Sequence, residues 1–525
     1  MRFAPLPGLV ALAALLSACA VGPDYKRPAA LVPARYKEAR PQPGWKLGQP
    51  NDTFNRGAWW TIYDDPVLDG LEQRIDISNQ NLKAAAAALT QAEEIVAEAR
   101  AGFFPTGTVN LQAQRSRSGG SASSGTGSSF VSSGGGSRIG SFFSDQVAAS
   151  WTPDFWGQIR RTVEANVATA QASAADLASA RLSAQGTLAG DYLQLRIADE
   201  LKRLLDQSAA AYAESLRITQ NQYRSGTTDQ SAVSQAQAQL QATEAQSIAT
   251  GVTRAQFEHA IAVLIGVPPA ELTIAPTSAV IQIPDIPPGL PSALLERRPD
   301  IAAAERTMQA ANAEIGVQVA AFYPTITLSA DAGTAAAALN KLVGETGEFW
   351  SFGATLAETV FDAGLRHAQV QAAVAVFNED LAGYRQTVLT AFQQVEDQLA
   401  ALRILADEAK VQEAALAAAR EAERVINNQY LAGTVAYTNV IVAEQTALGD
   451  AETALTIRED RLVASASLIQ GLGGGWNAAQ LPSRGAIETR APLNFNPLPP
   501  ILPVQGQEPQ DRRGADGQVQ QIRGR

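Results

Sequence analysis

Residues 221–227 read NQYRSGT, and residues 428–434 read NQYLAGT. A second pair of matching stretches lies earlier in each half: residues 103–106 read FFPT, and residues 322–325 read FYPT. The first pair is offset by 207 residues and the second by 219, which fits a longer Gly/Ser-rich loop in the first half. Self-similarity at this spacing predicts a duplicated unit, and not a string of unrelated domains.

Each repeat is predicted to run helix, strand, strand, long helix, helix. The first repeat covers residues 65–269, with helices at 65–102, 158–223 and 229–265 and strands at 104–115 and 145–155. The second covers residues 299–476, with helices at 299–320, 364–431 and 438–472 and strands at 325–333 and 349–361. Residues 270–298 are a connector between the repeats, and residues 477–525 are a tail whose last 20 residues are predicted to be disordered.

The predicted strands alternate between apolar and polar residues, which is typical of a strand with two different faces. In the first strand Val109 and Leu111 share a face, opposite Asn110 and Gln112. Strands of this length match tilted membrane-spanning strands, but four strands cannot close a membrane barrel. Open edges in lipid would leave backbone groups without partners. If the strands span a membrane, several chains must therefore share one barrel.

The long helices set a second constraint. A helix over residues 158–223 would be roughly 100 Å long at 1.5 Å per residue. No globular domain is that wide, so the helices are expected to pack lengthwise as in a coiled coil. Their apolar positions are mostly Ala, which allows close approach between helices.

The amino terminus has the pattern of an export signal, a basic residue followed by a short apolar stretch. Residues 16–19 read LSAC and resemble the lipobox of a bacterial lipoprotein, with cleavage after residue 18 and lipidation of Cys19. Several acyl chains on one residue would anchor the chain firmly in a membrane. Ala20, and not Asp, follows the Cys, and by resemblance to sorted lipoproteins this predicts the outer membrane. Residues 19–64, rich in Pro, Gly and polar residues, are expected to form an extended arm.

Composition excludes several classes of function. Lys and Arg total 41 against 52 Asp and Glu, a net charge of −11 that argues against a nucleic-acid partner. One Cys and two His leave almost no ligands for a zinc, haem or iron–sulfur site, so no metal and no cofactor are expected. The sequence contains no catalytic triad or phosphate-binding loop, so the protein is not expected to be an enzyme.

Several separate motifs resemble the TolC-like outer membrane factor family, in its OprM/NodT-type lipoprotein branch. They are Trp59-Trp60 with residues 65–68 (DPVL), residues 294–301 (LLERRPDI), residues 320–324 (AAFYP) and residues 472–476 (LGGGW). The resemblance covers about residues 19–476.

The resemblance implies an α+β membrane protein that forms a homotrimer. Three chains would share one 12-stranded β-barrel in the outer membrane and a 12-column α-helical barrel in the periplasm. In each repeat the long helix would form one column, and the two shorter helices would stack end to end to form another. Part of the tail would join a collar around the middle. The implied partners are a periplasmic adaptor protein, an inner-membrane pump of the RND class and outer membrane lipids.

The same resemblance assigns roles to residues at the helix-to-helix turns. Gly226-Thr227 and Gly433-Thr434 are expected at the periplasmic tips, where the adaptor docks. The aperture is expected near the second tip, at Tyr430, Thr438, Asn439 and Val442. Relatives often place acidic residues there, and TolC-type relatives hold the tip shut with an Arg and an Asp. The positions that match this ion pair are Val435 and Ala232, which predicts a polar or apolar constriction in this chain.

The leading interpretation is the outer membrane channel of a tripartite RND-type efflux system, which conducts exported compounds passively. A channel for metal efflux or for type I secretion is an alternative in the same class. An alternative from a different class is a structural coiled-coil lipoprotein without a pore. The alternating strands argue against this last interpretation.

Overall fold

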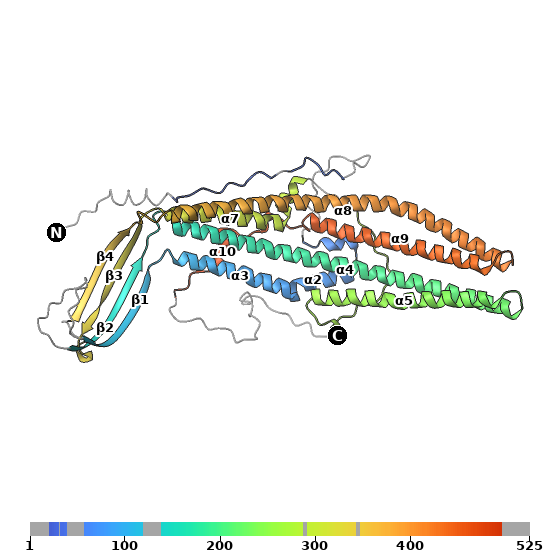
Figure 1. Cartoon of the computed structure of the whole chain (residues 1–525), viewed down its shortest axis with the longest axis horizontal. Coiled ribbons are helices and arrows are strands. Elements are labelled where there is room, and N and C mark those ends of the chain that lie inside the picture. The colour runs from blue at the N-terminus through green and yellow to red at the C-terminus, as the bar shows by residue number, and fades with distance from the viewer. Residues whose placement is uncertain are drawn as a thin grey trace, which may run out of the picture.

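The structure is a computed structural model. It describes residues 20–30, 32–38, 57–118, 138–286, 291–342 and 347–495. The molecule is elongated, with its four strands at one end and two helical hairpins reaching the other (Figure 1). No helix in these ranges is both long enough and apolar enough to cross a lipid bilayer.

The two repeats follow the same order of elements. The first contains α2 (Pro66–Ser78), α3 (Gln80–Ala101), β1 (Thr106–Ser118), β2 (Arg138–Trp151), α4 (Gln158–Arg224) and α5 (Gln230–Leu264). The second contains α6 (Leu294–Arg297), α7 (Pro299–Ala320), β3 (Thr325–Ala336), β4 (Glu348–Ala357), α8 (Leu365–Leu431) and α9 (Tyr437–Gly471). The helices α4 and α8 both have 67 residues, and α5 and α9 both have 35.

Short elements connect and flank the repeats. They are the 3-10 helices η1 (Trp59–Tyr63), η2 (Pro269–Glu271), η3 (Pro291–Ala293), η4 (Leu339–Lys341) and η6 (Ala478–Gln480), and the α-helix α10 (Arg484–Arg490). Helix α10 packs on α3 and α4, and Arg490 forms an ion pair with Glu93 at 2.9 Å. Residues 496–525, including the segment predicted to be disordered, lie outside the described residues.

Several element bounds differ from those expected. The helix expected over residues 65–102 is divided at Asn79, where the backbone is extended. The Asn79 side chain caps α3, because its Oδ1 accepts a hydrogen bond from Leu82 N at 3.0 Å. The strands extend into segments whose Gly/Ser composition predicted a loop, because the backbone ladder between Ser116 and Gly140 needs no apolar side chains. Strand β2 ends at Trp151 and not at 155, because Pro153 has no N–H to donate to the ladder.

The four strands form one antiparallel sheet in the order β1-β2-β3-β4, so β1 and β4 each have an edge that no other described strand pairs with. Side chains paired across the sheet share a face. Two neighbouring rows on one face are wholly apolar: Val109, Val147, Ala332, Trp350, and Gly107, Ala149, Ala330, Phe352. Trp350 is 81% exposed, so no described part of the chain covers this face.

The opposite face of the sheet is polar. Asp331 accepts hydrogen bonds from Gln146 Nε2 at 3.1 Å and from Ser351 Oγ at 2.9 Å, which links three strands. The apolar face ends toward the loops in a row that includes Asp145 and Glu348. A sheet with one continuous apolar face and one hydrogen-bonded polar face matches a wall between lipid and water.

The shorter helices stack end to end in the same way in both repeats. In the first, Asn79 Nδ2 donates to the carbonyl of Leu264 at 2.7 Å, where α5 ends against the α2–α3 break. In the second, Arg298 Nη1 donates to the carbonyl of Gly471 at 3.1 Å, where α9 ends against the α6–α7 break. Each junction has a glycine at positive φ, Gly266 or Gly473, because a Cβ there would collide with a backbone carbonyl.

These stacks form columns beside the long helices. Helix α4 packs against α3 and α5 on one side and against α7 and α9 on the other, and α8 packs against α7 and α9 (Figure 1). A core of buried side chains, Tyr192, Leu193 and Ile261 among them, lies where the first-repeat junction meets α4 and α9.

Candidate functional site

The two helical hairpins end in the same backbone turn. At the first tip Thr227 N donates to Gln222 O at 2.9 Å, and Gly226 N donates to Tyr223 O at 3.0 Å. The second tip repeats both bonds at 2.9 Å, from Thr434 N to Gln429 O and from Gly433 N to Tyr430 O. This pair of bonds is the Schellman motif, which satisfies the last carbonyls of a helix.

The glycines are required by backbone conformation and not by crowding. Gly226 and Gly433 both have φ of +75°, in the left-handed region that other residues rarely adopt. A Cβ on either would meet no atom within 4 Å among the described residues. Thr227 and Thr434 each also donate a hydroxyl hydrogen bond to the same carbonyl that accepts their amide. Each tip is therefore a well-ordered turn that is open to solvent.

A small apolar cluster ties the two hairpins together just behind the tips. Its buried members are Ala232, Ala236, Tyr430, Tyr437 and Val440, and Val435 packs against them. Ala232 and Val435 are the positions at which an Arg–Asp pair was considered from the family resemblance. In this chain an apolar contact occupies that place.

Tyr430 does not lie where the sequence interpretation placed it. Its side chain is buried between α4 and α8, and its hydroxyl bonds to Gln222 and to Thr219. Its ring also packs on Tyr437, with centroids 5.2 Å apart. A side chain held in this way cannot line an open passage, so Tyr430 joins the hairpins and is not part of the aperture surface.

The other three aperture residues lie together. Thr438, Asn439 and Val442 are all exposed on the first turns of α9. Their spacing places them on one side of the helix, directly after the second tip. This surface carries one apolar and two neutral polar side chains.

Glu444, which no sequence motif indicated, is buried two residues beyond Val442. Its Oε2 has no hydrogen-bond partner among the described residues, and only 6% of the residue is exposed. Burial, with a smaller contribution from Glu423, raises the pKa of Glu444 to about 7. The available signal was its position: residues 440, 444, 447 and 451 form one buried stripe, which should be apolar.

The remaining candidate site lies at the membrane end. Cys19 itself is outside the described residues, but the chain that follows it is placed next to the junction of β2 and α4. Val21 N donates to Trp156 O at 3.1 Å, and a Cβ on Gly157 would lie 2.8 Å from Ala20 Cα. Within the described ranges, no group of three or more His, Cys, Asp or Glu side chains is arranged to hold a metal ion.

Comparison with known proteins gives consistent matches over most of the chain. The outer membrane efflux protein family matches residues 71–267 and 290–474. The cation efflux system protein CusC of Escherichia coli O6:H1 is 29% identical over 475 residues, which cover 90% of this chain and 98% of CusC. The probable efflux pump outer membrane protein TtgC of Pseudomonas putida is 28% identical, over 92% of this chain and 99% of TtgC.

The fold has solved counterparts as well. The outer-membrane channel OprN superposes with a TM-score of 0.76 at 26% identity, over 87% of this chain and all of OprN. The expected α+β fold, outer-membrane location, trimeric assembly and partnership with an adaptor and a pump are confirmed. The chain therefore belongs to the outer membrane efflux protein family, as a subunit of the outer-membrane channel of a tripartite efflux system.

Proposed function

We propose that the two tips, at Gly226-Thr227 and Gly433-Thr434, are the surfaces that receive the periplasmic adaptor. The observation that carries this proposal is that both hairpins end in the same ordered and exposed turn, at the end of the molecule opposite the sheet (Figure 1). A turn that is already ordered lets a partner dock without the entropic cost of ordering the chain on binding. Each subunit has two such turns, one in each repeat, so a trimer has six.

The aperture is proposed to be formed by Thr438, Asn439 and Val442, repeated in three copies. These side chains are exposed on one side of α9 and carry no charge. A narrow ring that contains Val442 would oppose ion flow by dewetting, without the electrostatic selection that a carboxylate ring imposes. Replacement of Val442 by Asp should therefore raise the conductance of the closed channel to cations.

Cys19 is proposed to carry the lipid anchor. Ala20 and Val21 lie at the junction between the sheet and the helices, which is the level at which acyl chains on Cys19 would enter the same membrane as the sheet. The anchor and the barrel would then hold the subunit at one depth.

The pump is proposed to be of the RND class, and the channel is proposed to conduct its cargo passively, with no catalytic step. The named relatives serve cation efflux in one case and an efflux pump of unstated cargo in the other. We assign the selection of cargo to the pump, because the exposed aperture residues can discriminate by size and polarity but carry no charged group that would bind one cargo specifically.

Cysteine cross-linking tests the docking proposal directly. The chain has one Cys, which lipidation would block, so an introduced Cys is the only free thiol. Thr227→Cys and Thr434→Cys should each cross-link to the adaptor in cells that express the cognate pump. Thr90→Cys, exposed on α3 near the membrane end, is the matched control. Cross-linking at Thr90 as strong as at the tips, or none at the tips while efflux continues, would refute the proposal.

A further inference from the structure

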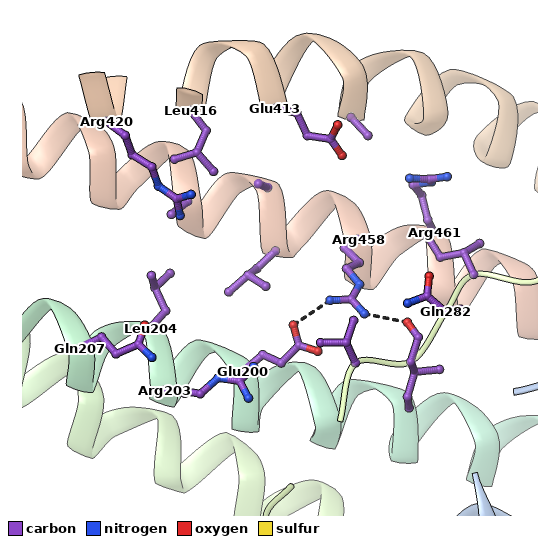
Figure 2. A pocket seen from close by; sticks show the side chains of 17 residues that line it. Glu200, Arg203, Leu204, Gln207, Gln282, Glu413, Leu416, Arg420, Arg458 and Arg461 are labelled. Carbon is purple, nitrogen blue, oxygen red and sulfur yellow. Dashed lines mark hydrogen bonds and ion pairs between the residues drawn. The ribbon is translucent and has the colours of Figure 1, made fainter. Parts of the chain in front are cut away.

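A pocket of about 570 Å³ lies between the repeats, far from both tips and from the sheet. Helix α4 forms its floor, α8 and α9 form its other walls, and residues 280–283 of the connector cross one side (Figure 2). Its size falls within the range of small-molecule sites. Exposed side chains at its rim, among them Gln207 and Glu413, show that it opens to solvent.

The charge of the pocket is opposite to that of the chain. Four arginines line it, against two carboxylates, whereas the whole chain carries −11. The arginines come from three helices: Arg203 from α4, Arg420 from α8, and Arg458 and Arg461 from α9. Figure 2 shows Arg203 beside Glu200 on α4, Arg420 extending from α8, and Arg458 and Arg461 on α9. Converging positive charge with low-dielectric walls attracts anions.

One of the four arginines is already fixed in place. Arg458 forms an ion pair with Glu200 at 2.8 Å and donates to the carbonyl of Ile281 at 2.6 Å. These two bonds hold its guanidinium between α4 and the connector (Figure 2). A group held in this way loses little freedom when a ligand binds.

The other three arginines have unused binding capacity. Arg203, Arg420 and Arg461 form no ion pair within 4.0 Å with any residue that the structure describes. In addition, Arg461 Nε is buried with no acceptor in the described part of the chain. A buried donor without a partner costs free energy that an acceptor on a ligand would recover.

We infer that this pocket binds a small anion that carries two or more carboxylate or phosphate groups. Guanidinium groups pair with both of these in bidentate geometry, and one ligand with two such groups can span arginines on different helices. The ligand would join α4 of the first repeat to α8 and α9 of the second. The site is separate from the tips and the aperture, so binding does not require conduction.

Calorimetry on the purified detergent-solubilised trimer tests this inference, with pyrophosphate and citrate as probes and acetate as the monovalent comparison at equal ionic strength. Saturable binding of the multivalent probes, one per subunit, is expected, with little or none of acetate. The double variant Arg203→Gln/Arg420→Gln should bind at least about 10-fold more weakly, since each charge-assisted contact contributes roughly that factor or more. Glu413→Gln, which removes a negative charge from the pocket, should tighten binding about 3-fold.

Arg424→Gln is the matched control, because Arg424 lies one turn from Arg420 on α8 and pairs with Glu421 away from the pocket. It should bind the probes as the unmodified chain does. A trimeric mass for every variant shows that folding is intact. Hydrogen exchange gives an independent readout: pyrophosphate should protect residues 280–283 and the facing turns of α4 and α9.

Three results would overturn the inference. The first is the absence of saturable binding by either multivalent probe. The second is equal binding by the double variant and the Arg424→Gln control. The third is unchanged anion binding together with weaker capture of the adaptor by the double variant, which would make the pocket a surface for an acidic protein segment.

Discussion

The two tips share one backbone turn but are supported in different ways. At the first, the Asp229 carboxylate caps α5 by accepting hydrogen bonds from Ala232 N at 3.0 Å and Ser231 Oγ at 2.7 Å. At the second, Ala436 occupies the cap position of α9 and offers no side-chain bond. Tyr437 instead packs on Tyr430 and shares a hydrogen bond with Ser215 of α4. Both tips share the apolar cluster, but the first also has a side-chain cap of its own, whereas the second has only the contacts with its neighbour.

The same asymmetry appears about two turns further along the helices. Glu444 on α9 is buried, whereas the position 207 residues earlier, Gln237 on α5, is exposed and neutral. A duplicated unit therefore need not give two equivalent hairpins. In this chain the α8–α9 hairpin has the contacts that can be broken and the buried group that can titrate.

The largest test of this difference is Tyr437→Ala. Loss of a buried aromatic side chain should cost about 3–5 kcal/mol locally. Hydrogen exchange should therefore accelerate strongly in the first turns of α9 but not in those of α5. Tyr437→Phe, which removes only the hydroxyl bonded to Ser215, should cost about 1 kcal/mol. Equal acceleration in both hairpins would show that the Asp229 cap does not stabilise the first tip independently of the shared cluster.

The second test is pH. The pKa of Glu444 is raised from 4.5 to about 7, so the folded hairpin keeps a proton that the unfolded chain releases in that interval. Stability of the α8–α9 hairpin should be full below about pH 4.5 and fall by up to about 3 kcal/mol as the pH rises through 7. Hydrogen exchange of α9, corrected for intrinsic rates, measures this. Glu444→Gln should abolish the dependence, and its persistence there would assign it to another group.

The third test concerns what the tips have in common. Gly226→Ala and Gly433→Ala should each cost about 1 kcal/mol, because both residues have the same positive φ and open surroundings. Local exchange at each turn, with the other tip as internal control, measures the two costs. Clearly unequal costs would mean that the two turns are not equivalent in solution.

The smallest effects come from exchanging the caps. Asp229→Ala should weaken the start of α5 by about 1 kcal/mol, and Ala436→Asp should strengthen the start of α9 by about 0.5–1 kcal/mol. In the double variant the difference between the hairpins should shrink or reverse in exchange measurements. If Ala436→Asp has no effect, a side chain at position 436 does not reach the free backbone N–H groups at the start of α9.

Much of the fold follows from local patterns. Alternation alone placed Val109 on the apolar face of its own strand, and the strand register then joins it with Val147, Ala332 and Trp350 in one row. The helix break at Asn79 was not predicted, because the helical pattern continues on both sides and the reason for the break is the distant carbonyl of Leu264. The strand ends at Ser118 and Arg138 lie in Gly/Ser-rich sequence, where composition predicts a loop but a paired neighbour imposes a strand.

The candidate site divides in the same way. The glycine turns follow from sequence, because the Schellman motif is local and the repeat shows it twice. The burial of Tyr430 does not, since its partners Thr219 and Gln222 lie in the other repeat. The arginine pocket also joins residues from helices of both repeats, so no short motif indicates it.

The unpaired edges of β1 and β4 have a consequence for biogenesis. A subunit that reaches the membrane alone carries two rows of backbone donors and acceptors that only other subunits can satisfy. We therefore expect insertion and assembly to be coupled, at a rate that rises with the number of chains available. A copy that keeps β1 but lacks β4 could pair with a neighbouring subunit through β1 only, and this would prevent closure of the shared barrel. Co-expression of such a copy should lower the number of functional channels by more than its fraction of the total chains.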